Sequence, residues 1–224
     1  MAPPNPAELQ WVRAPQQARS HDTLARLLDA AEAMLEEAPW DQCTVAALVA
    51  RGRSSIGAFY ARFPDKDSLL QHLHQRRSTD GVHTADAALA SERWAGVPIE
   101  PLIRAVVAFV AQDYVDHAGL HREIVRRNST DARFRERSAH VAGHVVRLMA
   151  LLLEERRQEI DVDDTLRAAD MLHRILYSVL DQSVQFVDRP PGPVALTPPL
   201  LVEAIVRAML GYLGVRAASP RGKP

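Results

Sequence analysis

Two histidines one helical turn apart have the spacing in this sequence that best suits metal or acid–base chemistry. His140 and His144 are four residues apart, so both imidazoles would lie on one face of a helix and could supply two ligands to a zinc ion. No third ligand is identifiable by spacing. The sequence also contains no nucleophile elbow and no glycine-rich loop that would cradle a phosphate. We therefore expect no enzyme activity, no metal and no cofactor, and the histidine pair is the only feature that favours an enzyme.

Residues 44–63 have the pattern of two short helices joined by a turn of about three residues that contains a glycine. Thr44 is a suitable N-cap for the first helix, which Gly52 ends. Ser55 is a suitable N-cap for the second helix, which we expect to extend through Phe63, because a proline follows. This is the pattern of a helix-turn-helix, whose second helix lies in the major groove of DNA with its N-terminal end toward the base edges.

The second helix of this segment would present one face to a protein core and the other to DNA. Phe59 and Phe63 are one turn apart and should point into the core. An apolar reading face can contact thymine methyl groups but cannot hydrogen-bond guanine or adenine edges, so base recognition would depend on polar neighbours or on DNA shape. The outward positions are Ile56, Gly57, Tyr60 and Ala61, and the residues expected to read bases are Ser54, Ser55 and Tyr60 with Arg53 or Arg62.

Three short motifs in this region match those of the TetR family of transcriptional regulators in order and spacing. They are Thr-Val at 44–45, Ser-x-Gly-x-Phe-Tyr at 55–60 and Phe-x-x-Lys-x-x-Leu at 63–69, and residues 27–31 also fit the family's first helix. Over residues 22–74 the sequence therefore resembles that family. The remainder of the chain is similar to it only in the number and length of its helices.

The resemblance implies roles for several side chains. Tyr60 would contact a phosphate or a base edge, and Lys66 would pair with a phosphate with help from a helix N-terminus. Thr44 and Ser55 would cap their helices and could also donate to the DNA backbone. The predicted DNA-binding residues are Thr44, Arg53, Ser54, Ser55, Ile56, Gly57, Ala58, Tyr60, Arg62 and Lys66.

The turn departs from the family's usual Ala-Gly-Val-Ser. Residues 52–55 read Gly-Arg-Ser-Ser, so the glycine is shifted by one position. The family often has a polar or basic residue at position 56 and a Thr or Ser at position 58, where this chain has Ile56 and Ala58. We therefore expect limited discrimination per base pair, or reliance on DNA shape.

Helical periodicity extends along the chain, and no segment alternates apolar and polar residues as a strand would. An apolar stripe from Leu24 to Leu35 predicts a first helix that Pro39 ends, and Asp65 would cap a fourth helix that ends near Arg77. Longer helices are predicted at 99–117, 119–127, 131–158, 163–188 and 198–214. The predicted fold class is therefore all-α.

This pattern divides the chain into four parts. We expect a flexible arm at residues 1–19, a three-helix DNA-binding domain with the helix-turn-helix at 20–76, a larger helical ligand-binding and dimerisation domain at 77–216, and a disordered tail at 217–224.

The last two predicted helices, at 163–188 and 198–214, are apolar around much of their circumference and must be covered on two sides. One side can pack on the domain's own core and the other on a second copy, which predicts a homodimer with a four-helix interface. A deeply buried monomer core is the alternative. A two-fold dimer would read a palindromic site.

The helices between residues 99 and 186 could enclose a pocket, because ligand pockets combine apolar walls with a few polar contacts. Ordinary core packing is the alternative for each residue, and no motif identifies the small-molecule effector. The candidates are Phe109, Tyr114, Phe134, His140, His144, Met149, Met171, His173, Tyr177 and Gln182.

Bulk composition is ordinary for a globular protein. The chain has 224 residues, of which 47% are hydrophobic, and a net charge of −1, although residues 44–80 carry six basic and three acidic side chains. We find neither a signal peptide nor a membrane span, so we expect a cytoplasmic location.

Together with the family resemblance, these features predict a sequence-specific DNA-binding regulator, a ligand-responsive repressor acting as a homodimer on a palindromic operator. The alternative is a ligand- or protein-binding helical dimer that has lost specific DNA binding.

Overall fold

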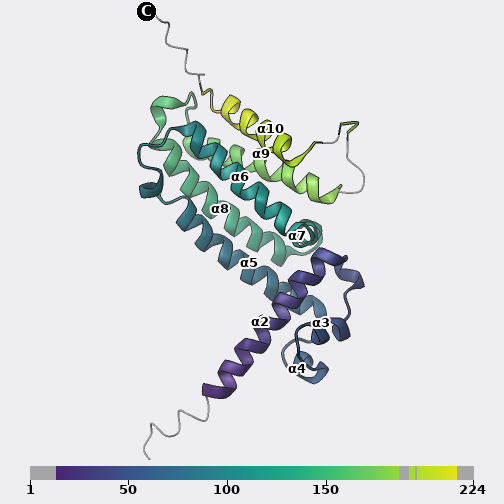
Figure 1. The fold of residues 1–224 in the computed structure, drawn as a ribbon. Coiled ribbons are helices and arrows are strands. Elements are labelled where there is room, and N and C mark those ends of the chain that lie inside the picture. Colours follow the sequence, from purple (N-terminus) through teal and green to yellow (C-terminus); the bar gives the residue numbers. More distant parts are fainter. Residues whose placement is uncertain (1–13, 187–191, 195, 216–224) are drawn as a thin grey trace, which may run out of the picture. The chain divides into compact units, whose positions relative to one another are not determined.

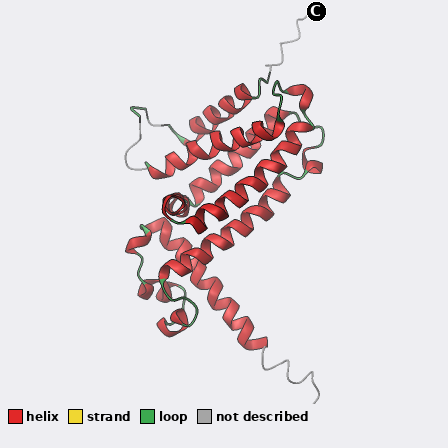
Figure 2. Cartoon of the chain, turned by 180° about the vertical axis from the view of Figure 1, so that it is seen from behind, coloured by secondary structure: helices red, strands yellow, loops and turns green. Residues whose placement is uncertain are grey.

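The computed structural model describes residues 14–186, 192–194 and 196–215, and its secondary structure over these residues is helical (Figures 1 and 2). The predicted all-α fold class is confirmed. Most of the predicted N-terminal arm and the whole predicted tail lie outside the described residues.

The chain divides between Arg76 and Arg77 into two compact units. The first contains α2 (Ala14–Glu37), the short helices α3 (Val45–Arg51) and α4 (Ile56–Tyr60), and the beginning of α5 (Lys66–Ala88). Its core is apolar and collects side chains from all four helices. The most deeply buried side chains include Leu27, Ala31, Leu35, Trp40, Leu48, Phe59, Phe63, Leu69, Leu70 and Leu73.

Three helix boundaries in and near the first unit differ from the prediction. Helix α2 begins at Ala14, so residues 14–19 of the expected arm are helical. Helix α4 ends at Tyr60 rather than Phe63: Ala61 and Arg62 form a turn, and the proline at 64 disfavours a helical conformation in Phe63. Helix α5 continues to Ala88 instead of ending near Arg77, because Ala85 and Leu89 are buried in the core of the second unit.

The second unit is built from α6 (Ile99–Asp116), α7 (Ala118–Thr130), α8 (Ala132–Glu154), α9 (Thr165–Gln185) and α10 (Pro198–Tyr212). Helix α9 packs against α8 and α10, and α6 packs against α10. Helix α7 is seen nearly end-on in Figure 1, so it crosses the direction of α6 and α8. These five helices agree with the five predicted between residues 99 and 214, with boundaries shifted by up to four residues.

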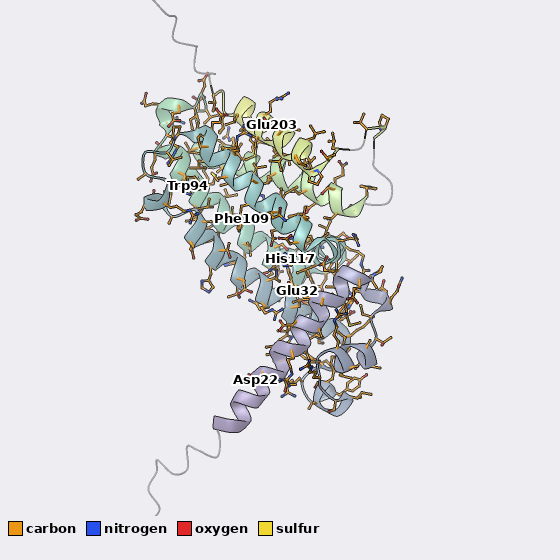
Figure 3. All side chains as sticks on the ribbon, viewed as in Figure 1. Asp22, Glu32, Trp94, Phe109, His117 and Glu203 are labelled. Atoms are coloured by element: carbon orange, nitrogen blue, oxygen red, sulfur yellow. The ribbon has the colours of Figure 1, made fainter. Side chains whose placement is uncertain are left out.

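A buried arginine fastens the segment between α5 and α6 to the end of α8. Arg156 is only 5% exposed, and its guanidinium donates to the carbonyl oxygens of Trp94, Val97 (2.7 Å) and Leu152 (2.8 Å). Trp94 lies in the short 3-10 helix Ser91–Trp94 (Figure 3). Because a buried charge must be paired or hydrogen-bonded, this side chain and the loop geometry depend on each other.

Replacing Arg156 by methionine keeps the apolar stem but leaves the Trp94 and Val97 carbonyls without their donor. We expect Arg156→Met to lower the free energy of unfolding by about 2–4 kcal/mol, because each unsatisfied buried polar group costs about 1–3 kcal/mol. Urea unfolding would measure this. The exposed Arg133→Met is the control and should change stability by no more than about 0.5 kcal/mol. Equal effects of the two substitutions would contradict the fastening role.

Candidate nucleic-acid interface

The two predicted helix caps of the helix-turn-helix are confirmed. Thr44 Oγ1 accepts a hydrogen bond from the Ala47 amide at 3.2 Å, and Ser55 Oγ accepts one from the Ala58 amide at 3.1 Å. A hydroxyl that accepts in this way still has its own hydrogen to donate. Both side chains can therefore fix the start of a helix and donate to a phosphate oxygen.

The turn between α3 and α4 is held against α2 through Gly52. A Cβ atom at this position would lie 3.1 Å from Leu27 Cδ2 and 3.1 Å from the Leu48 carbonyl oxygen, so only glycine fits without displacement. Arg26 Nε donates to the Gly52 carbonyl at 3.2 Å. The left-handed residue of the turn is the next one, Arg53, with φ of 47°. The shifted glycine thus serves close packing, and an arginine takes the left-handed conformation.

Helix α4 has the two faces that the sequence predicts. Phe59 is fully buried and Phe63 is 2% exposed, so both belong to the core. Ile56 and Tyr60, one turn apart, are 54% and 55% exposed. The outward positions Gly57 and Ala61 are also exposed. The outward face therefore carries an isoleucine and a tyrosine separated by small residues.

Lys66 has a different set of partners from the one predicted. Its ammonium donates to the carbonyl oxygens of Trp40 (2.8 Å), Asp41 (3.3 Å) and Cys43 (3.0 Å), and it lies 5.5 Å from the centre of the Trp40 ring. The Trp40 indole in turn donates to Asp67 at 2.8 Å. An ammonium has three hydrogens, and three carbonyls already accept them. In this structure Lys66 holds the loop before α3 rather than facing outward to a phosphate.

Two other predicted base-reading side chains are turned toward the protein. The Ser54 hydroxyl oxygen is buried, and no atom of the described residues forms a hydrogen bond with it. The Arg62 guanidinium donates to the Ala58 carbonyl at 2.9 Å. Arg53, by contrast, is exposed. Of these three side chains predicted to read bases, only that of Arg53 is exposed on the surface.

In the second unit, the structure brings together three of the predicted ligand-binding residues. The rings of Tyr114 and Tyr177 meet edge to face with centres 6.1 Å apart, and His173 stacks on Tyr177 at 4.3 Å. Sequence analysis missed the acidic partner, Asp181, which accepts a hydrogen bond from the Tyr114 hydroxyl at 2.6 Å. Burial, followed by the nearby Asp181 charge, raises the pKa of Tyr114, and burial above all raises that of Tyr177 to about 12.

A second carboxylate, Asp113, joins three helices of this unit. It contacts Arg77 of α5 at 2.9 Å, His121 of α7 at 2.8 Å and His117 at 3.1 Å. The His121 ring also stacks on Tyr114 with centres 3.8 Å apart. Burial alone would raise the pKa of Asp113, but the hydrogen bond and charge of His121, together with Arg77, outweigh it and lower that pKa to about 2.

The other predicted ligand-binding residues do not join this cluster. Phe134 and Met149 are buried. His144 contacts Asp86 at 2.6 Å, and Phe109, on α6, is 54% exposed (Figure 3). His140, Met171 and Gln182 are also exposed, because they lie on the outer faces of α8 and α9. Four of the ten candidates, Phe109, His140, Met171 and Gln182, are therefore exposed, and a ligand-binding role for any of the ten stays a prediction.

Neither a metal cluster nor a membrane span is found in the described part of the chain. Over residues 14–186, 192–194 and 196–215, no three histidine, cysteine or acidic side chains are grouped as metal ligands would be. Over the same residues, no helix combines the length and the hydropathy that crossing a bilayer requires.

An all-helical chain with a capped helix-turn-helix followed by a larger helical unit defines a class of DNA-binding transcriptional regulators. Residues 27–73 match the family described as "Bacterial regulatory proteins, tetR family", and residues 98–213 match "Tetracyclin repressor-like, C-terminal domain". The chain belongs to the TetR family, and the resemblance found in residues 22–74 is confirmed. No curated protein sequence matches the chain.

Solved structures with the same fold include several regulators. A Mesorhizobium loti protein described as TetR-family is 15% identical with a TM-score of 0.67, covering 86% of this chain and 97% of its own. Reduced Escherichia coli NemR is 16% identical with a TM-score of 0.64, covering 88% and 100%. RolR in complex with resorcinol is 18% identical with a TM-score of 0.56, covering 93% and 98%. At these identities the likeness concerns the fold.

Removing the ammonium of Lys66 should destabilise the protein itself. Lys66→Met keeps the apolar stem but leaves the carbonyls of Trp40 and Cys43 without this donor, so we expect a loss of about 1–3 kcal/mol in unfolding free energy. Urea unfolding would measure it, with the exposed Arg53→Met as a variant expected to retain stability. Wild-type stability in Lys66→Met would show that the three hydrogen bonds contribute nothing.

Acid should remove the contribution of Asp113. Because its folded-state pKa is lowered from 3.8 to about 2, its stabilisation is present above pH 4 and is lost as the pH falls toward 2. Asp113→Asn should cost up to about 2 kcal/mol at pH 7, a penalty that shrinks progressively below pH 4. Unfolding measured between pH 3 and 7 tests this, with Asp170→Asn, in the half-exposed Asp170–Arg174 ion pair of α9, as control. A penalty that does not change with pH would argue against the ionic role.

Proposed function

We propose that this TetR-family protein represses transcription as a homodimer on a palindromic DNA site, and that a small molecule bound by the second unit changes its DNA affinity. The observation that carries the DNA-reading part is the outward face of α4. Ile56, Gly57 and Tyr60 are exposed on a helix whose other face is buried, next to two capped helix starts. We propose repression rather than activation because residues 98–213 match a domain described as tetracycline-repressor-like.

Exposed apolar side chains on α9 and α10 support the homodimer. These helices pack side by side (Figures 1 and 2), and each keeps a face that the second unit does not cover. Met171 on α9 is 39% exposed, and Phe186, the residue directly after the helix, is 46% exposed. On α10, Leu200 and Tyr212 flank the small exposed residues Ala204, Ala208 and Gly211. A second copy would cover both faces, and a two-fold axis would present two α4 helices to a palindrome.

The polar cluster of Tyr114, Asp181, Asp113 and His121 supports the ligand response. Polar groups removed from water are costly unless paired, and here the buried Tyr114 and the partly buried Asp181, Asp113 and His121 are held by hydrogen bonds beside the apolar core. A small polar molecule could take over some of these hydrogen bonds. RolR, whose fold is similar to that of this chain, was solved with the ligand resorcinol, and we extend that kind of ligand binding to this chain.

Helix α5 provides a covalent route from this cluster to the DNA-binding unit. It begins with Lys66, which holds the loop before α3, and it carries Arg77, which contacts Asp113 of α6. A ligand that changes the hydrogen bonds of Asp113 would thereby change the restraint on α5. The coupling equals the difference in ligand affinity between the two arrangements of the protein.

Gly57 offers a test that separates DNA binding from stability. A Cβ atom at this position would meet no protein atom within 4 Å, yet glycine in a helix costs about 1 kcal/mol relative to alanine. We expect Gly57→Ala to raise stability by about 0.5–1 kcal/mol. We also expect it to weaken DNA binding at least about tenfold, because the methyl group would stand between α4 and the groove. The measurement is fluorescence anisotropy on a duplex that the wild-type protein selects from a random-sequence pool.

Gly143→Ala, a glycine substitution in helix α8 of the second unit, serves as the matched control and should leave DNA affinity unchanged. If Gly57→Ala binds the selected duplex as tightly as the wild type, α4 does not approach DNA through this face. Failure of the wild type to prefer any duplex over random DNA would favour a helical dimer without specific DNA binding.

A further inference from the structure

Apart from the exposed Arg53 and the hydroxyl of Tyr60, the surface of the helix-turn-helix offers few polar groups for reading base edges. The Ser54 hydroxyl is buried, Arg62 donates to the Ala58 carbonyl, and Lys66 donates to three loop carbonyls. The Thr44 and Ser55 hydroxyls already accept cap hydrogen bonds and retain only a single hydrogen each to donate. Such single donors suit phosphate oxygens better than the paired hydrogen bonds that distinguish one base from another.

Ile56 is the first residue of α4 and is 54% exposed. Tyr60 follows one turn later on the same face and is 55% exposed. The exposed Gly57 lies between them, and the half-buried Ala58 adds only a methyl group. The N-terminal end of α4, which enters the groove first in a helix-turn-helix, is therefore apolar.

An apolar side chain distinguishes bases by the one apolar group that the major groove displays. Thymine alone carries a C5 methyl group there, beside its O4 acceptor, whereas guanine, adenine and cytosine present only hydrogen-bond donors and acceptors and no methyl group. Placing an isoleucine against a donor or acceptor would remove water from it without replacing the hydrogen bond, which is unfavourable. Ile56 thus favours thymine through contact and disfavours the other bases through desolvation.

We propose that Ile56, supported by the ring edge of Tyr60, reads thymine methyl groups, so that each half-site carries a T·A pair opposite the N-terminal end of α4. This inference rests on the proposed function and names the chemistry by which that same surface selects its DNA. Specificity at these positions comes from methyl contacts rather than from hydrogen bonds to base edges.

Replacing thymine by deoxyuridine tests the proposal, because it removes only the C5 methyl group. The duplex is the one selected from a random pool by the wild-type protein, and each thymine is replaced in turn. We expect one or two positions in each half-site at which deoxyuridine lowers wild-type affinity about three- to fivefold, the effect of one buried methyl group. At the same positions, 5-methylcytosine in place of cytosine should recover part of the affinity that a T-to-C change removes.

The variant Ile56→Ala identifies the side chain that makes the contact. It should bind the thymine duplex more weakly than the wild type and should no longer distinguish thymine from deoxyuridine at the affected positions. Because Ile56 is exposed, this variant should keep the wild-type thermal midpoint. Leu151→Ala, at a 62% exposed position of α8, is the matched control and should retain the full deoxyuridine effect.

Two results would overturn the proposal in distinguishable ways. If a duplex is selected and no deoxyuridine substitution changes affinity by more than twofold, the methyl-reading role is wrong while the proposed function stands. The same conclusion follows if Ile56→Ala keeps the wild-type deoxyuridine effect. If the wild type selects no duplex at all, the proposed function fails and this inference fails with it.

Discussion

The close contact between Gly52 and helix α2 is the constraint on which the DNA-binding unit depends. A Cβ atom at Gly52 would lie 3.1 Å from both Leu27 Cδ2 and the Leu48 carbonyl oxygen, so a larger residue there would have to push these neighbours aside by a few tenths of an ångström. The left-handed turn residue is then Arg53, at a cost of about 1–2 kcal/mol for a non-glycine side chain. Two stabilising features offset that cost: the burial of Phe59 and Phe63 in the core, and the hydrogen bond that Ser55 accepts as the N-cap of α4. Both also fix the direction in which α4 begins after the turn.

In the second unit, two partly buried carboxylates beside the apolar core connect several helices. Asp113 is bound by Arg77 and His121, and Asp181 is bound by the Tyr114 hydroxyl. Each carboxylate has a partner from another helix, so the cluster fixes the relative register of α5, α6, α7 and α9. A polar network of this kind stabilises one arrangement of helices only while every member remains paired.

Patterns among residues close together in the sequence were sufficient to predict the helices, their caps and the buried face of α4. Thr44 and Ser55 were predicted as caps because their effect depends on neighbours three residues away, and the Phe59 and Phe63 spacing predicted the buried face of α4. The partners of Lys66, by contrast, are 23–26 residues away in sequence, and Tyr114 and Asp181 are 67 apart. Such pairings depend on tertiary packing, which hydrophobic periodicity does not report.

The internal pairing of basic side chains in the first unit has a consequence for binding in different salt. Arg51 forms a salt bridge with Glu37, with a nitrogen–oxygen distance of 2.7 Å. Arg76 forms salt bridges with Asp29 and Glu32 at 2.6 and 2.7 Å. A cation that already neutralises a carboxylate of its own chain displaces few condensed counterions when it approaches DNA, so its contribution to the salt dependence of affinity is small. Under the proposed function, occupancy of the DNA site would then follow the concentration of the proposed small molecule more closely than the ionic strength of the cell.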